Sequence, residues 1–416
     1  MKTLRIHGPI YLLLLVVVFT AYGRNMDVPL WDLTDARILC DAHELSRDPV
    51  SMFGHIGFYF SQPVLQLLFL GEYRLFGLEP AGYLAVNLAI HATNALIVYM
   101  LVNMLFPRRR MAVLAALLFA FGVGSYGRVL TSIHQLENLL LAGLHLLVLY
   151  AFIRNDFRHG GKVVSRLYLL GLGLFLVTGL TRATSFSLVG VLIAYKAFFH
   201  GFGGRRIVTA DILIFLAVAL AFYWAQGQWG YRAPTVFTDS HELERFSLMS
   251  VKNLFRYLNM MFFPMQRSPL LEDAPFYMVW AFEARTVIRT LLSLAIVSYS
   301  FFGFVFGNRA IRFFIAWTYI TVLPFTDQSD SGAWLNLSHL YLTSVGFCVV
   351  LAAGTVGTAG LLAARPSRKW VPYLVPLSFV LVALALSDRL HHRSTHAADS
   401  PEGIALRMET AESCRR

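Results

Sequence analysis

The chain has 416 residues, of which 57% are hydrophobic and only 14% are charged. Its mean hydropathy of +0.59 excludes an ordinary water-soluble domain and predicts an integral membrane protein. The net charge of +11 is dispersed over short loops, which argues against a nucleic-acid-binding surface.

Apolar segments follow one another along most of the chain. A membrane span needs roughly 20 residues, and about eleven segments, several of them short, are candidates. They lie near residues 9–23, 80–105, 111–126, 136–153, 167–181, 183–199, 209–225, 286–306, 311–326, 338–363 and 370–387. The first has no clear A-x-A cleavage site after it and is interpreted as an uncleaved helix. We expect an all-α polytopic membrane domain over residues 1–387, and a short polar tail over residues 388–416 that ends outside.

The basic residues between these segments fall on one side of the predicted topology. They cluster at 108–110, 154–166, 196–206, 308–312 and 365–369. The positive-inside rule places these loops and the N-terminus in the cytoplasm. The expected location is the cell inner membrane, or the ER membrane if the source is eukaryotic.

Two loops on the outer side, 24–79 and 226–285, are too long to be simple turns. Each contains an amphipathic stretch, 57–78 in the first and 250–264 in the second, that we expect to lie as a helix in the membrane interface. Such a layout suits a protein that acts on a lipid-linked substrate.

Signatures of soluble enzymes are missing from the sequence. There is no Walker A loop, G-x-G-x-x-G, G-x-S-x-G or H-E-x-x-H pattern. The three cysteines, Cys40, Cys348 and Cys414, predict neither a disulfide framework nor a zinc ribbon. No cofactor is expected, although a divalent metal is left open.

A seven-residue pattern, Asp-x-His-Glu-Leu-x-Arg, occurs in both outer loops, as "DAHELSR" from Asp41 and "DSHELER" from Asp239. A metal site made from Asp41, His43, Asp239 and His241 is one interpretation. Chance or helix capping is the other, since two Asp-x-His pairs without a known contact are weak evidence.

Four segments resemble one known family, in the same order along the chain. Residues 60–106 match its pattern of an aromatic-Gly-Leu turn followed by Tyr-x-x-x-Asn-x-x-x-His-x-x-Asn-Ala. The matching positions are Pro63, Phe76, Gly77, Leu78, Tyr83, Asn87, His91, Asn94 and Ala95. Residues 180–196, 253–264 and 338–354 resemble three later segments. The chain thus resembles the GT-C membrane glycosyltransferases, in particular the TMTC-type protein O-mannosyltransferases and their bacterial relatives, without a helical-repeat array.

The resemblance implies a particular activity. It implies transfer of a sugar from a polyprenyl-phosphate-linked donor to a protein, lipid or glycan acceptor on the periplasmic or lumenal side, with membrane lipid as a further partner and no nucleic acid. Two alternatives stand beside it, a catalytically inactive relative that binds lipid and a lipid or sugar transporter.

The sequence also departs from the family's pattern. Thr34-Asp35 stands where the family has paired aspartates, Gln62 replaces an arginine, and "GVGSYG" at 122–127 replaces a His-Pro-Val-His-x-Glu segment. Arg182-Ala183 replaces a Lys-Glu pair, and Ser338 replaces an arginine. These losses support the inactive alternative.

Asp35 is the predicted general base. It follows the first span by about a dozen residues and matches a family aspartate, and a single base with in-line attack would give inversion. Its rivals are Asp32 and Glu44, while solvated loop acids or helix caps are the structural alternative. Glu137 is the second catalytic candidate, because it falls at a family Asp position; stabilisation by the helix dipole is its alternative.

Arginines on the outer side are candidates for binding the donor phosphate. These are Arg182, Arg256 and Arg128, each of which could instead snorkel or contact ordinary lipid head groups. Candidates for an acceptor, sugar or loop site are Asp32, Asp41, His43, Glu44, His134, His241, His339 and Tyr341. Asn87, His91 and Asn94 share one face of a span and predict hydrogen bonds between helices.

Overall fold

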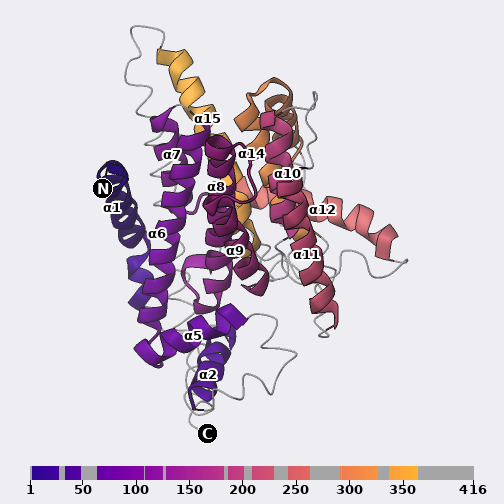
Figure 1. The fold of residues 1–416 in the computed structure, drawn as a ribbon. Coiled ribbons are helices and arrows are strands. Elements are labelled where there is room, and N and C mark those ends of the chain that lie inside the picture. The colour runs from indigo at the N-terminus through magenta and orange to yellow at the C-terminus, as the bar shows by residue number, and fades with distance from the viewer. Residues whose placement is uncertain are drawn as a thin grey trace, which may run out of the picture.

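The computed structural model describes residues 2–27, 33–47, 63–106, 108–124, 128–181, 186–200, 209–228, 242–262, 291, 293–326 and 337–363. Within these ranges every regular element is an α-helix or a short 3-10 helix (Figure 1). The all-α class predicted from the sequence is therefore confirmed.

The helices have the following bounds. They are α1 (Lys2–Tyr22), α2 (Leu33–Arg47), α5 (Pro63–Phe76), α6 (Pro80–Leu105), α7 (Arg109–Ala120), α8 (Leu136–His159), α9 (Arg166–Thr181), α10 (Phe186–His200), α11 (Ala210–Gln228), α12 (Glu242–Phe262), α14 (Arg309–Val322) and α15 (Leu340–Ala363). A further helix, Ser293–Phe306, precedes α14. The 3-10 helices are η1 (Gly23–Asp27), η2 (Arg128–Leu130), η3 (Ile133–Gln135), η6 (Leu323–Phe325) and η7 (Leu337–His339).

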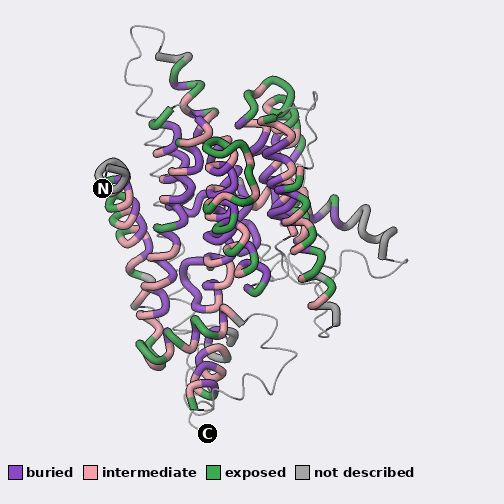
Figure 2. Tube along the Cα trace, in the orientation of Figure 1, coloured by how far each residue is buried: buried purple, intermediate pink, exposed green. Residues whose placement is uncertain are grey.

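Helices α6, α7, α8 and α15 form the centre of the bundle, and the buried residues concentrate there (Figure 2). Helix α1 packs on α6, α9 on α8, and α14 against both α15 and α10. Large apolar side chains such as Trp224, Phe301 and Phe306 are exposed on the outer helices. Extensive exposed apolar surface is expected where a protein faces lipid, so the bundle is that of a membrane protein.

Three described helices are long and apolar enough to cross a membrane, judged by length and composition. They are α6, the continuous run Ile133–His159, and Leu340–Gly360 within α15. Five shorter apolar helices, including Arg166–Thr181 and Phe186–His200, fall on other expected spans. The candidate span 370–387 and the tail 388–416 lie outside the described residues, and the count of eleven spans stays a prediction.

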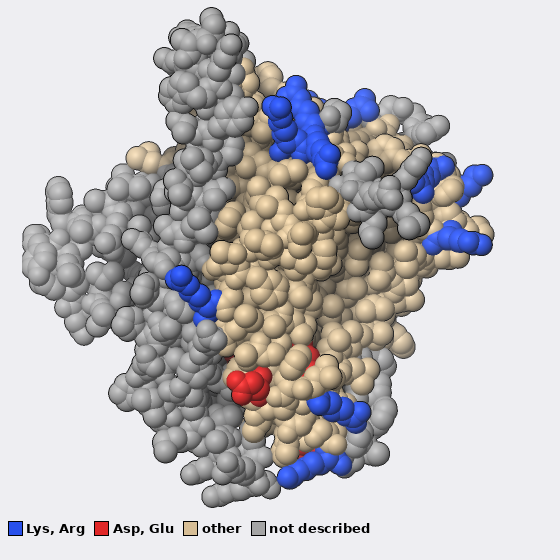
Figure 3. Space-filling view, turned by 90° about the vertical axis from the view of Figure 1, so that its left-hand side faces the viewer, with Lys and Arg blue, Asp and Glu red and all other residues tan. Residues whose placement is uncertain are grey.

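The bundle has two ends that differ in their loops. Helices α2 and α5 lie at the lower end in Figure 1, which we call the α2 end. The turn between α8 and α9, the end of α10 and the start of α11 lie at the opposite end, which we call the Lys196 end. In the side view of Figure 3, most of the lysine and arginine side chains lie toward the upper, Lys196 end, with a few at mid-height and at the lower end. The acidic side chains that this view shows lie toward the lower, α2 end.

Helix α2 differs from the expectation, because the sequence predicts that this stretch belongs to the first outer loop. It covers Asp35, Asp41, His43 and Glu44. Its apolar side chains Leu39, Ala42 and Leu45 recur every three residues and are buried. This amphipathic spacing is typical of a helix lying on a protein surface, and the acidic residues between those positions had masked it.

The predicted polar face of α6, made of Asn87, His91 and Asn94, forms hydrogen bonds to neighbouring segments of the bundle, as expected. His91 Nδ1 lies 2.7 Å from the hydroxyl of Tyr341 on α15, and His91 Nε2 lies 3.0 Å from the carbonyl oxygen of Ala120. Asn94 donates from Nδ2 to the carbonyl of Leu139 on α8 at 2.8 Å. Tyr341, one of the loop-site candidates, is therefore buried in this packing at the α2 end of α15.

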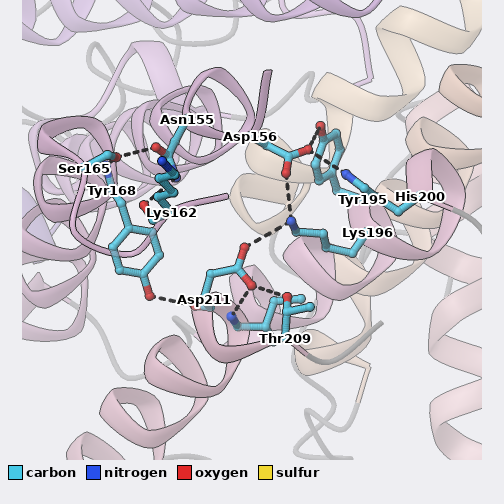
Figure 4. A network of polar contacts seen from close by, with 11 residues as sticks. Asn155, Asp156, Lys162, Ser165, Tyr168, Tyr195, Lys196, His200, Thr209 and Asp211 are labelled. Atoms are coloured by element: carbon cyan, nitrogen blue, oxygen red, sulfur yellow. Dashed lines mark hydrogen bonds and ion pairs between the residues drawn. The ribbon is translucent and has the colours of Figure 1, made fainter. Parts of the chain in front are cut away.

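A buried ion network joins three helices at the Lys196 end (Figure 4). Lys196 Nζ on α10 lies 2.8 Å from Asp156 Oδ1 on α8 and 3.1 Å from Asp211 Oδ2 on α11. His200 Nε2 lies 3.0 Å from Asp156 Oδ2, and the Tyr195 hydroxyl donates to the same oxygen at 2.9 Å. The sequence groups Lys196 with the basic residues at 196–206, but Lys196 lies inside α10 and only 8% of its side chain is exposed, so it is not a loop residue.

The cysteines also differ from expectation. Cys40 on α2 is disulfide-bonded, although the sequence had predicted no role for cysteine. Cys348, in the middle of α15, is free and buried.

Candidate functional site

The α2 end brings a carboxylate from the first predicted outer loop against the turn that begins α8. Asp35, in the first turn of α2, meets Ser132 and His134, which flank the start of η3. These residues are about a hundred positions apart in the sequence. The contact is therefore tertiary.

Apolar packing explains why this turn lies where it does. Ile133 and Leu136 are buried in a cluster with Leu39 of α2 and Leu84 of α6. Because Ile133 points into that cluster, its neighbours on either side are left to meet Asp35. Asn87 of α6 donates from Nδ2 to the carbonyl of Ser132 at 3.1 Å, which fixes the backbone of the turn.

The Asp35 carboxylate accepts hydrogen bonds from three groups. The Ser132 hydroxyl lies 2.8 Å from Oδ1 and 3.0 Å from Oδ2. The backbone N–H of His134 donates to Oδ1 at 2.8 Å, and the imidazole Nδ1 lies 2.9 Å from the same oxygen. Asp35 is only 2% exposed. Such a set of donors holds the carboxylate in one orientation.

A chain of amides continues from the other side of the imidazole. The side-chain nitrogen of Gln135 contacts His134 Nε2, and Gln135 Oε1 accepts from Asn138 Nδ2 at 2.8 Å. Because Asn138 donates to Gln135 Oε1, the Gln135 amide nitrogen is the atom left to donate to His134. The imidazole is therefore assigned as the tautomer with its proton on Nδ1, facing Asp35.

Asn138 also lines a small cavity between the ends of α8, α10 and α14 and the start of α15. Phe325, His339 and Tyr341 line it as well. His339 is stacked on Phe325, with ring centroids 4.2 Å apart and an angle of 12° between the rings. Its Nδ1 lies 3.3 Å from the hydroxyl of Tyr257 on α12. The predicted second outer loop, which carries α12, thus reaches the same end of the bundle.

Several predicted site residues meet in this region. Asp35 and His134 are in direct contact. His339 and Tyr341 line the cavity, and Asn138, which also lines it, connects the cavity to His134 through Gln135. Glu137 lies in the first turn of α8, between Gln135 and Asn138 in sequence, and is partly buried.

Other predicted residues lie apart from this contact. His43 faces α5, where its Nδ1 lies 2.5 Å from the Tyr73 hydroxyl. Asp41 is partly buried on α2, and Glu44 is exposed. Within the described ranges, no three His, Cys, Asp or Glu side chains are grouped so that they could hold a metal ion. Asp239 and His241, the other half of the repeated pattern, lie outside those ranges.

The arginine candidates are only partly described. Arg256 is exposed on α12, with Nη1 at 3.4 Å from Asn253 Oδ1, and it directly precedes Tyr257, which contacts His339. Arg128 begins η2, and η2 lies against η7, which carries His339. Arg182 and Asp32 lie outside the described residues.

Sequence reasoning missed Ser132, Gln135 and Asn138. The stretch "TSIHQLEN" does carry a signal for them, because polar side chains surround a single isoleucine just before a long apolar helix. Without the position of α2, nothing in that stretch shows which of these side chains meets a carboxylate.

Glu72 of α5 is a second acid at this end. It is 7% exposed, and its Oε2 has no hydrogen-bond partner among the described residues. Burial raises the pKa of this carboxyl group from 4.5 to about 7. It is therefore protonated in the folded protein at mildly acidic pH.

No protein-family model and no curated protein sequence matches the chain. Among solved structures, the chain is similar to the apo crystal structure of the oligosaccharyltransferase of Archaeoglobus fulgidus, with a TM-score of 0.53 and 13% sequence identity. The likeness covers 97% of this chain and 59% of the archaeal protein, so this chain spans well under two thirds of that protein's length. The likeness supports the predicted GT-C fold, while the resemblance to the TMTC-type branch stays a prediction.

Proposed function

We propose that this chain, with its GT-C fold, is a membrane glycosyltransferase. It transfers a sugar from a polyprenyl-phosphate-linked donor to a hydroxyl or amide acceptor at the α2 end. The same end faces the periplasm of a bacterial inner membrane, or the lumen if the membrane is that of the ER.

One observation carries the proposal. A buried carboxylate, Asp35, is held by three donors beside a histidine at one end of an apolar bundle. Desolvated acids paired with a specific partner are more frequent at functional sites than at ordinary surfaces. A lipid-linked donor would present its phosphate and sugar at this depth, where the membrane-embedded helices end.

The remaining roles follow from the chemistry of the reaction. The departing phosphate needs cationic donors, for which Arg182, Arg256 and Arg128 are the candidates from the sequence. Glu137 and His339 are suited to contact acceptor or sugar hydroxyl groups. A single proton-accepting group with in-line attack gives inversion at the anomeric carbon.

Two features support the proposed orientation. Cys40 on α2 is disulfide-bonded, and disulfides persist in oxidising compartments such as the periplasm and the ER lumen. The Lys196 end carries the predicted cytoplasmic clusters at 108–110 and 308–312, in agreement with the positive-inside rule.

The test is a transfer assay. Membranes that contain the full chain are incubated with a panel of radiolabelled polyprenyl-phosphate sugars, and label in the acceptor fraction is counted. Asp35→Asn should lower the rate of transfer by at least about 10²-fold, because the site loses the carboxylate that holds His134 and Ser132 in place for proton transfer. Glu79→Gln removes an exposed carboxylate at the same end and should leave the rate unchanged.

Two outcomes would contradict the proposal. Equal transfer by wild type and Asp35→Asn would remove Asp35 from the reaction. A wild-type chain that binds polyprenyl phosphate but transfers no sugar from any donor would be a lipid-binding relative, and one that moves labelled lipid across a bilayer would be a transporter.

A further inference from the structure

We infer that His134, and not Asp35, takes the proton from the acceptor, and that Asp35 and Ser132 are positioning residues that orient its imidazole. This inference rests on the proposed transfer of a sugar at the α2 end. It reassigns the role that the sequence had suggested for Asp35.

Asp35 is poorly placed to receive a proton from a substrate. Its two oxygens already accept from the Ser132 hydroxyl, the His134 backbone N–H and the His134 imidazole. Its side chain is only 3% exposed, whereas that of His134 is 24% exposed. An acceptor hydroxyl can therefore approach the imidazole more readily than the carboxylate.

The hydrogen bonds around His134 run in one consistent direction. Asn138 donates to Gln135, Gln135 donates to His134 Nε2, and His134 Nδ1–H donates to Asp35. Ser132 Oγ also lies 2.7 Å from His134 Nδ1, so the Nδ1 proton faces both Ser132 and Asp35. Nε2 lies on the opposite side of the ring and faces Gln135. An acceptor hydroxyl that displaces the Gln135 amide meets a neutral imidazole that is ready to accept a proton.

The proton transfer balances as follows. The acceptor oxygen attacks the anomeric carbon, and a new carbon–oxygen bond forms there. The bond from that carbon to the donor phosphate breaks, and its electron pair leaves on the polyprenyl phosphate. The acceptor proton moves to His134 Nε2, and the imidazolium is stabilised by Asp35 through Nδ1–H. Release of that proton to water restores the starting state.

Among the described residues, the elements packed against η3 carry the ionisable groups nearest the imidazole. Helix α2 carries the Asp35 carboxylate, α6 the neutral amide of Asn87, α8 Glu137 and η2 Arg128. Asp35 is in direct contact with the ring. If His134 accepts the acceptor's proton, the pH dependence of transfer should report an imidazole.

The test measures kcat/KM against pH with the donor found active in the transfer assay. The kcat/KM of the wild type should fall about tenfold per pH unit below about pH 6–7, the range in which imidazoles titrate. We call this decline the acid limb of the profile. The kcat/KM of His134→Gln should be about 10²–10⁴-fold lower than that of the wild type, and its pH profile should lack the acid limb. His159→Gln, at the exposed end of α8, is the matched control and should behave as wild type.

Chemical rescue separates a catalytic imidazole from a structural one. Added imidazole should restore transfer to His134→Gly, because it can occupy the vacated space and accept the proton. It should not rescue Asp35→Asn, whose own imidazole is still present but misdirected. Ser132→Ala should lower the rate by about tenfold or less and keep the acid limb.

The inference fails if His134→Gln transfers sugar within about threefold of wild type, or if the acid limb persists in that variant. It also fails if imidazole does not rescue His134→Gly that is folded, as judged by its elution and thermal unfolding in detergent. These outcomes differ from a failure of the proposed function, in which wild type transfers no sugar from any donor at any pH.

Discussion

Glu72 stabilises the packing of α5 only while its carboxyl group is protonated. Its pKa is raised by burial from 4.5 to about 7. Because the folded state holds the proton more tightly than the unfolded state, this contribution is complete below pH 4.5 and is lost as pH rises toward 7. The loss amounts to about 3 kcal/mol.

Glu72→Gln should therefore remove this part of the pH dependence. Thermal unfolding in detergent micelles between pH 4 and 8 is the measurement, and the midpoint of the wild type should fall relative to that of the variant as pH rises. Glu79→Gln should keep the wild-type profile. A constant difference between wild type and Glu72→Gln at every pH would show that Glu72 does not titrate in this range.

Individual residues of the site were only partly predictable from the sequence. Asp35 and His134 stood out because each follows or precedes an apolar span on the same side. Their contact was not predictable, since it depends on how α2 folds back on η3. Ser132 and Gln135 carry no signal that distinguishes them from the many other polar residues at helix ends.

At the scale of elements, the buried ions Lys196, Asp156 and Asp211, which we call the Lys196 network, hold α8, α10 and α11 together. Lys196→Met should destabilise the protein by about 3–5 kcal/mol, because it leaves the carboxylates of Asp156 and Asp211 buried without their cation. The measurement is the midpoint of unfolding in a denaturing detergent titration. Lys162→Met removes an exposed lysine at the same end and is the control.

A second substitution sharpens this experiment. Adding Asp211→Asn to Lys196→Met removes one uncompensated charge and should recover part of the lost stability. If the double variant is less stable than Lys196→Met alone, the two residues do not form the coupled pair that the geometry describes.

Long apolar helices were the elements that the sequence predicted best. The expected span 80–105 coincides with α6, and 338–363 nearly coincides with α15, because hydropathy over 20 residues leaves little freedom of interpretation. Helix α2 was missed because its apolar face is narrow. The burial of Lys196 was not predictable, because the sequence does not show which basic side chain at a helix end pairs with buried carboxylates.

At the scale of the whole molecule, the predicted orientation can be tested from its two ends. A cysteine introduced at Glu79, exposed at the α2 end, should react with a membrane-impermeant maleimide added to spheroplasts. A cysteine introduced at Lys162 should react only after the membrane is permeabilised. Wild type gives the background from its native cysteines. The opposite pattern would invert the topology and place the candidate site in the cytoplasm.

The overall fold class was predictable because composition and span order survive divergence that removes sequence matches. The archaeal oligosaccharyltransferase shares only 13% identity but aligns over 97% of this chain. Donor, acceptor and activity do not follow from such a likeness, since one fold supports several functions. Under the proposed function, the side chains at the α2 end are the ones that would decide those properties.

Helix α8 connects the two polar clusters of the protein. It begins directly after the turn that carries His134 and includes Asp156 near its other end, and its 24 residues span roughly 36 Å. A helix that is rigid along its axis transmits a displacement at one end to the other. The Lys196 network holds one end of α8 against α10 and α11, and the turn that carries His134 lies at the other end. A single helix thus joins the buried ion network to the candidate site.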